Sequence, residues 1–440
     1  MLGWEDQPIL NGGVGKACFH LAEVLASQAD LTLIVPQAES KAVAQHAEVL
    51  GLDAMDLSTV KQAPVSHTLE RFGKTYKVAA DLSPYEDTTA AYMSDEDFTP
   101  EDSANKETSA PTAAVESTSD SQDFKPKVTV VAGAKGTLNF EVIQFSRFAA
   151  RLASHKDFEV VYAHDWMTYL AGIEIKVQKR VPLVLHVHSL SFDRQGPKAR
   201  GWVYELEMRA FQEADLILAV SERTARMIVK RYGVDSKKVK VVYNGCSDTP
   251  ATAPVKKAGK QVVFLGRMVP QKGPLQFLKI AELVKKQDPE VRFVMAGHGP
   301  QLEAAKQMAQ TLGIEEAVTF TGFLPSQEAM ALLHASTVFC LPAISEPFGL
   351  AALEATQAGL PVVLSNQTGA GEVLPQALQA DAADTEGMAK HILSLLSDAE
   401  LSHEVVEDNQ QAVHDLTWDS TALHVYDALL KVANTQFAHH

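Results

Sequence analysis

The chain has 440 residues, of which 46% are hydrophobic and 21% are charged, and its formal net charge is −16. This length exceeds what one ordinary core holds, so two domains are expected. The acidic balance argues against a general nucleic-acid-binding protein, which needs a basic face. The three cysteines, Cys18, Cys246 and Cys340, are far apart and form no metal-binding or redox pair, which suits a reducing compartment.

From the sequence we expect neither a signal peptide nor a membrane span. The first twenty residues lack a basic segment followed by an apolar one, and no apolar run approaches the roughly 20 residues that cross a bilayer. We therefore expect a cytoplasmic protein without an integral membrane segment, and peripheral contact with a membrane stays open. The first residues, MLGWE, resemble the end of a strand whose beginning is missing, so the completeness of the amino terminus is also open.

Short apolar runs rich in β-formers alternate with helical patterns along the chain, as in parallel sheets covered on both faces. The expected strands of the first half are residues 31–35, 128–132, 160–163, 183–188, 216–220 and 239–243. Those of the second half are residues 262–266, 292–296, 318–322, 337–342 and 361–365. The sequence therefore predicts an α/β protein with two Rossmann-like, doubly wound domains.

A polar, proline-containing stretch over residues 244–260 separates the two series of strands. We expect a first domain over residues 1–247 and a second over 248–416. Residues 417–440 have apolar side chains at helical spacing, which predicts a closing helix that packs across the two domains; its return to the first domain is what the family resemblance given below implies. An acidic segment, about residues 95–125, holds nine acids and two bases, a net charge of −7, and predicts a disordered surface insertion whose role is open.

Several sequence features of the first domain indicate ligand contacts at the carboxyl ends of strands. Gly13 lies among glycines that precede a helix, where free N–H groups can face an anion, although a plain tight turn is equally consistent. His164 follows a strand and can contact a sugar hydroxyl or belong to the core. His188, Asp193 and Arg194 follow the next strand and are candidates for acceptor contacts. His186 and His188 share one side of their strand, but the sequence places no third metal ligand near them.

The second domain opens with a strand followed by a cationic loop. Arg267 and Lys272 lie in this loop, five residues apart, and two cations in such a place suit a diphosphate. Gly266 begins the loop, and Gly297 follows the next strand, where its backbone can pass close to a nucleotide base. A solvated loop with scattered charges is the competing interpretation.

The stretch SEPFGLAALEATQAG places two glutamates around the start of a helix. The backbone N–H groups of Gly349 and Leu350 can hold a phosphate, and Glu354, one turn further along the same face, can accept hydrogen bonds from a ribose. Glu346 lies outside the helix start, where a transferred group would lie. A hydrolase pair of carboxylates is an alternative, but the cationic loop favours a phosphorylated donor.

Taken together in chain order, the motifs GGVG, HDW, SE, NG, GR…QKGP, AGHGP, GF and EPFGLAALEA resemble the retaining GT-B glycosyltransferases of family 4, also called glycosyltransferase group 1. The resemblance covers nearly the whole chain except residues 95–125. The amino-terminal half also resembles glycogen and starch synthases. Those enzymes carry a lysine before the paired glycines, where this chain has Asn11, which favours the broader family.

The resemblance implies the GT-B fold, with the active site in the cleft between the domains. It implies a nucleoside-diphosphate sugar, an ADP- or UDP-hexose, as donor, a saccharide or another hydroxyl compound as acceptor, and no metal or other cofactor. The implied roles are Arg267 and Lys272 on the diphosphate, Gly349 and Leu350 on the distal phosphate, Glu354 on the ribose, and Glu346 and His164 on the donor sugar. Gly13, Gly266, Gly297 and Phe348 would complete the donor site.

Two alternatives remain at this stage: a phosphorylase or synthase of the same architecture, and a non-catalytic protein that binds a sugar nucleotide. The donor base, the sugar, the acceptor and the oligomeric state are open.

Overall fold

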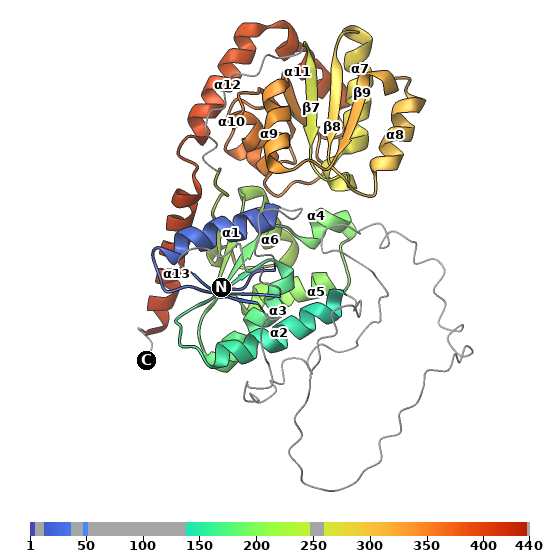
Figure 1. Cartoon of the computed structure of the whole chain (residues 1–440). Coiled ribbons are helices and arrows are strands. Elements are labelled where there is room, and N and C mark those ends of the chain that lie inside the picture. Colours follow the sequence, from blue (N-terminus) through green and yellow to red (C-terminus); the bar gives the residue numbers. More distant parts are fainter. Residues whose placement is uncertain (5–12, 37–46, 52–137, 247–258, 438–440) are drawn as a thin grey trace, which may run out of the picture.

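The computed structural model describes residues 1–4, 13–36, 47–51, 138–246 and 259–437. The expected strand 128–132, the acidic segment 95–125 and Asn11 lie outside the described residues. Within the described part, all named strands belong to parallel pairs, and the sheets are mixed with helices (Figure 1).

The first domain is built on β3 (Val161–His164), β4 (Leu183–Val187), β5 (Leu216–Ala219) and β6 (Val239–Val241), which pair in that order. A second parallel pair consists of β1 (Thr32–Val35) and β2 (Glu48–Gly51). Leu2 forms bridges with both Ile34 and Ala163, so the opening residues join the two sets of strands. The expected strands match these elements within one or two residues, except that β2 was not predicted.

The helices of the first domain are α1 (Gly13–Ala26), α2 (Leu138–Ser154), α3 (Trp166–Lys179), α4 (Ser191–Gln195), α5 (Trp202–Glu213) and α6 (Glu222–Tyr232). Side chains of α2, α3 and α5 share one apolar cluster on one face of the sheet, and α1 contributes to a different cluster. The expectation that Gly13 precedes α1 was wrong, because the helix already begins at Gly13. Glycine adopts both helical and turn conformations, so its presence alone does not mark the boundary.

The second domain contains the sheet β12-β11-β10-β7-β8-β9. Its strands are β7 (Gln261–Leu265), β8 (Arg292–Ala296), β9 (Val318–Gly322), β10 (Val338–Leu341), β11 (Val362–Ser365) and β12 (Leu378–Ala380). β10 and β11 are buried along their whole length, which explains their continuous apolar sequences. The strand order reverses between β7 and β10, and ligands of such sheets bind where this reversal lies, beyond the carboxyl ends of the strands.

The helices that cover this sheet are α7 (Pro274–Gln287), α8 (Leu302–Thr311), α9 (Ser326–Ala335), α10 (Leu350–Gln357), α11 (Thr385–Ser397) and α12 (Ala399–Val413). Short 3₁₀ helices occupy η6 (Gly196–Lys198), η7 (Ser236–Lys238), η8 (Pro270–Lys272), η9 (Glu315–Ala317) and η10 (Gly369–Glu372).

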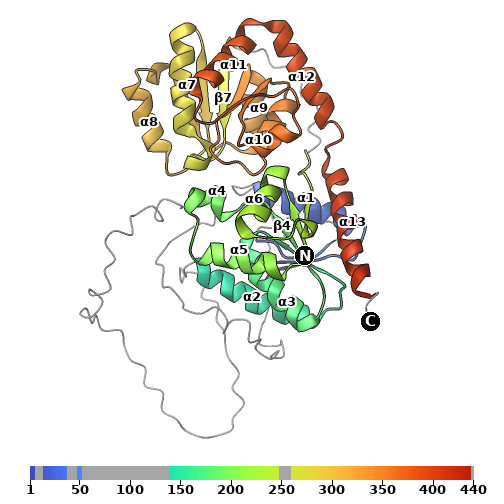
Figure 2. The same cartoon turned by 180° about the vertical axis from the view of Figure 1, so that it is seen from behind.

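The last helix, α13 (Trp418–Phe437), leaves the second domain and runs along the first (Figures 1 and 2). Trp418, Ala422, Val425 and Ala428 share a buried cluster with Ala17, Leu21 and Leu25 of α1 and with the sheet beneath. The Trp418 ring also stacks on His20, with 5.3 Å between the ring centroids. The carboxyl-terminal segment is therefore part of the core of the first domain.

Candidate active site

Two loops of the second domain meet at the reversal point of its sheet. One follows β7 and ends in η8, and the other follows β10 and leads into α10. The N–H groups of Ile344 and Ser345 both donate to the Gln271 carbonyl, at 2.7 and 3.2 Å. Gly273 has a φ of 72°, and a Cβ added there would overlap the Pro342 carbonyl oxygen. Only glycine therefore lets the two loops pack this closely.

Lys272 and Glu346 form an ion pair between these two loops. The Glu346 side chain is 8% exposed and that of Lys272 is 21% exposed, so the pair is largely withdrawn from water. A buried carboxylate needs such a partner, because an unpaired charge there would be strongly unfavourable. The structure thus brings together two residues that the sequence selected separately.

The start of α10 lies beside this pair. Gly349 is the N-cap residue with a φ of 108°, and no side chain caps the helix. The first N–H groups of a helix lack intrahelical partners and attract anions. An added Cβ at Gly349 would lie 3.2 Å from Glu346 Cγ, which shows how close the glutamate is to the helix start. Glu354 is half-buried one turn further along, and Arg267 is half-buried in the loop after β7.

The structure also places the other predicted donor-site residues. A Cβ on Gly297, whose φ is 144°, would overlap the Gly266 carbonyl oxygen, so glycine at position 297 allows the loops after β7 and β8 to touch. The Phe348 side chain is buried in the core and lies near the Tyr243 ring, so a contact with the donor, which stays a prediction, would come from its backbone. Gly13 lies at the first position of α1.

In the first domain, His164 lies at the end of β3 and is 1% exposed. Its Nδ1 is 3.0 Å from His188 Nε2, and its Nε2 has no hydrogen-bond partner among the described residues. Burial, followed by the nearby His188, holds the pKa of His164 well below its usual range, so the ring is neutral. Asp165 fixes the neighbouring turn, because its carboxylate accepts the N–H groups of His188 and Ser189 at 2.7 and 3.2 Å.

The structure supplies the third histidine that the sequence did not reveal. His164, His186 and His188 each offer a ring nitrogen within 4.8 Å of the others, and they form the one such group found in the described part of the chain. The hydrogen bond between His164 and His188 needs one N–H and one lone pair. If each neutral ring carries one proton, only one of the two outward nitrogens, His164 Nε2 or His188 Nδ1, then keeps a lone pair. This pairing fits a hydrogen-bonded histidine array better than three metal ligands.

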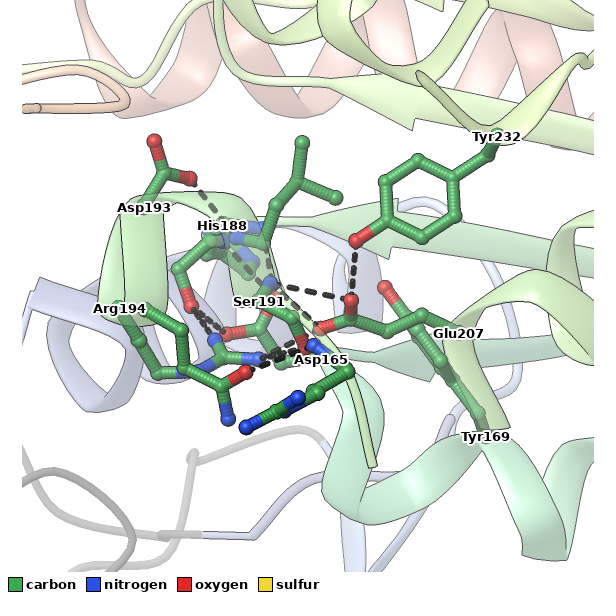
Figure 3. A network of polar contacts seen from close by, with 12 residues as sticks. Asp165, Tyr169, His188, Ser191, Asp193, Arg194, Glu207 and Tyr232 are labelled. Atoms are coloured by element: carbon green, nitrogen blue, oxygen red, sulfur yellow. Dashed lines mark hydrogen bonds and ion pairs between the residues drawn. The ribbon is translucent and has the colours of Figure 1, made fainter. Parts of the chain in front are cut away.

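Asp193 and Arg194, expected at the acceptor, belong to a buried polar network (Figure 3). Arg194 forms an ion pair with Glu207 at 2.5 Å and donates to Ser189 Oγ at 2.7 Å. Glu207 also accepts the Ser191 N–H and the Tyr232 hydroxyl, while Asp193 accepts the Leu190 N–H at 2.8 Å. The polar groups of both residues already have partners inside the protein, and their contact with an acceptor stays a prediction.

Sequence reasoning missed Glu207 and Tyr232. Glu207 lies between Leu206 and Ala210 on the buried side of α5, and an acidic residue among apolar helix positions is the signal that could have identified it. Tyr232, at the end of α6, offers no comparable pattern.

Comparison with known proteins identifies two related families. Residues 249–412 match the profile of the glycosyl transferases group 1, and residues 110–249 match that of glycosyltransferase family 4. A glycogen synthase of Mycobacterium tuberculosis is 28% identical over 284 residues, which cover 60% of this chain and 66% of that enzyme.

Two solved structures share the fold. Sucrose-phosphate synthase from Thermosynechococcus elongatus superimposes with a TM-score of 0.69 at 15% identity and covers 100% of this chain and 99% of its own. Anabaena HepE, solved in complex with UDP and glucose, gives a TM-score of 0.63 at 16% identity, with coverages of 97% and 98%. The two profile matches, the architecture of two doubly wound domains and these likenesses lead to one conclusion: the chain belongs to the group 1 glycosyltransferases, enzymes with the GT-B fold.

Proposed function

We propose that this enzyme transfers a hexose from a nucleoside-diphosphate sugar to a hydroxyl group of a saccharide or another acceptor, with retention of the anomeric configuration. The observation that carries the proposal is the Lys272–Glu346 ion pair beside the uncapped start of α10, at the reversal point of the second sheet. A cation, free N–H groups and a carboxylate in this arrangement suit a phosphorylated sugar better than a neutral one.

Donor binding would change the partner of Lys272. A diphosphate carries more negative charge than the Glu346 carboxylate, so Lys272 would turn to the diphosphate together with Arg267. The N–H groups of Gly349 and Leu350 would face the distal phosphate. Glu346, released from Lys272, would accept hydrogen bonds from hydroxyls of the donor sugar, and Glu354 would accept those of the ribose.

In the transfer step the bond between the anomeric carbon and the phosphate oxygen breaks, and a bond to the acceptor oxygen forms on the same face. The acceptor proton passes to an oxygen of the leaving diphosphate. Lys272, Arg267 and the start of α10 oppose the charge that develops on this group, so we propose that transfer needs no bound metal ion. His164, kept neutral by burial, would direct Nε2, the ring nitrogen that is not bonded to His188, to the donor sugar.

We propose an ADP- or UDP-hexose as the donor. The likeness to a protein solved with UDP and glucose and the match to a glycogen synthase support this choice. The acceptor is proposed only as a hydroxyl compound.

A donor panel tests the proposal. Purified protein is incubated with UDP-, ADP- and GDP-glucose, and the release of nucleoside diphosphate by slow donor hydrolysis is measured, followed by titration with the free nucleoside diphosphate. We expect one donor to be hydrolysed. The Lys272→Ala variant should bind the corresponding nucleoside diphosphate about tenfold more weakly or worse, because a charge-assisted contact is lost.

Lys279→Ala is the matched control, since Lys279 is an exposed lysine on α7, close to Lys272 in sequence. Unchanged binding in Lys272→Ala, or an equal loss in both variants, would contradict the diphosphate site. Binding without any nucleotide release, with every acceptor supplied, would instead indicate a non-catalytic binding protein.

A further inference from the structure

The first domain touches the loop that carries Glu346, although this loop belongs to the second domain. The contacts come from α6 and from the segment that contains α4. Ser221 Oγ donates to the Pro347 carbonyl at 2.7 Å, and the Ser345 hydroxyl donates to Asp193 Oδ1 at 2.6 Å. The N–H groups at the start of α6 donate to the Glu372 carboxylate of η10 at 2.7 and 2.8 Å. These bonds join residues that lie 126 to 152 positions apart in the sequence.

Arg223 makes the most specific of these contacts. Its Nη2 donates to Ser345 Oγ at 2.9 Å, and its Nε donates to the Gln367 carbonyl at 2.9 Å. The Ser345 hydroxyl therefore accepts from Arg223 and donates to Asp193, which fixes both its donor and its acceptor direction. Asp193 is 4% exposed, so this short chain of hydrogen bonds is shielded from water on its acidic side.

The Gln367 carbonyl is also the group that holds the backbone of Glu346. The Glu346 N–H donates to this oxygen at 3.0 Å, and the Glu346 carbonyl accepts the Gly369 N–H at 3.0 Å. The Nε of Arg223 therefore binds the same oxygen as the Glu346 backbone N–H, and its Nη2 binds Ser345, the residue directly before Glu346. A guanidinium presents its donors in a rigid, planar fork, so it holds these two acceptors at a fixed separation.

We propose that Arg223, acting with Asp193 through Ser345, is a positioning residue that holds Glu346 in its working orientation only when the two domains are in contact. If the domains separate, Arg223 leaves both Ser345 and Gln367, and the Glu346 loop loses its supports from the first domain. Approach of the domains is thereby coupled to the alignment of the carboxylate that faces the donor sugar. The catalytic part of this inference rests on the function proposed above, whereas its structural part does not.

The test compares Arg223→Ala with Arg223→Lys and Arg226→Ala. Arg226 is the matched control, because it lies on the same face of α6 and lines one surface groove together with Arg223. Its 3.6 Å ion pair to Glu372 also crosses the domain boundary. It makes no hydrogen bond to residues 345–347 or 367 among those described. The measurements are kcat and donor KM with the nucleotide sugar selected by the panel, and hydrogen exchange of the peptides that contain Glu346 and Gln367.

We expect Arg223→Ala to lower kcat by about tenfold or more while donor KM changes by no more than about threefold, because the lost contact aligns a group rather than binding the donor. Amide exchange around Glu346 and Gly369 should become faster in this variant. Arg223→Lys, which keeps the charge and one donor direction, should recover part of kcat. Arg226→Ala should leave kcat and the exchange rates near those of the wild type.

Equal effects of Arg223→Ala and Arg226→Ala would overturn the inference, since they would show that any cation at this boundary serves. Unchanged exchange around Glu346 in Arg223→Ala would overturn it as well. Failure of the proposed function can be told apart from failure of this inference. It would leave nucleotide release absent in the wild type or unaffected by Glu346→Gln, and the hydrogen-exchange result would still decide the structural part.

Discussion

His164 at the end of β3, His186 on β4 and His188 directly after β4 lie side by side, and all three are less than 10% exposed. Burial lowers the pKa of each of these rings, that of His188 to about 3. In the unfolded chain the same rings bind protons near pH 6.5. Acidification therefore favours the unfolded state, because that state alone takes up these protons over the range between the two pKa values.

We expect the free energy of unfolding to fall as the pH is lowered from about 6.5 to 4.5, each histidine contributing up to about 1.4 kcal/mol per pH unit. In His188→Asn the slope should be shallower than in the wild type by up to that amount. Urea titrations followed by tryptophan fluorescence at several pH values measure it. His424→Asn, at an exposed position of α13, is the control, and an identical slope in all three proteins would show that His188 is not neutral in the fold.

At the scale of elements, the loops after β7 and β10 depend on a glycine for their close approach. Gly273→Ala should lower the free energy of unfolding by roughly 2–4 kcal/mol, because the new Cβ meets a backbone carbonyl in addition to the cost of a positive φ. It should also weaken nucleoside diphosphate binding, since Lys272 directly precedes it.

Gly233→Ala is a matched control, because Gly233 has nearly the same conformation, with a φ of 68°, but no atom lies within 4 Å of an added Cβ. This variant should lose only about 1 kcal/mol, the conformational cost alone. Thermal and urea unfolding compare the two. A Gly273→Ala protein as stable as Gly233→Ala would mean that the loops have room to separate.

The helices and strands were largely predictable from the sequence, but the contacts between them were not. Continuous apolar runs identified strands such as β10 and β11, because buried parallel strands need apolar residues on both faces. β2 (Glu48–Gly51) and β12 (Leu378–Ala380) were missed because they are short and partly exposed, so they have no such pattern. Lys272 and Glu346 were selected by their residue types and their positions in loops, and both can be read from the sequence alone.

The remainder of the candidate site depends on residues that lie far apart in the sequence. Ser345 is an unremarkable loop residue until folding places it between Arg223 and Asp193. Likewise, His164 joins His188 only because β3 and β4 pair in one register. Local patterns carry no information about such contacts, since register and domain docking decide them.

At the scale of the whole molecule, α13 couples the stability of the two domains, because it follows the second domain in sequence and packs in the core of the first. Trp418→Ala should destabilise the protein by about 3–5 kcal/mol, because a large buried ring is lost from the contact between α13 and α1. Leu423→Ala on the same helix, at a side chain that is 50% exposed, should change stability by less than about 1 kcal/mol. Hydrogen exchange should show faster opening of α1 in the first variant only. Equal protection of α1 in both variants would argue against a role of α13 in that core.

No helix in the described part of the chain is both long and apolar enough to cross a membrane.

The polypeptide passes between the halves twice, once after Cys246 and again near Leu416, and the two passages touch, with the Cys246 N–H bonded to the Leu416 carbonyl at 2.7 Å. The backbone of Trp418 also lies against Gly245, where a methyl group would have no room. Sliding of one half past the other would break these contacts, whereas rotation about a line through them would keep them. A rotation of one half relative to the other would then have its axis at residues 245–246 and 416–418.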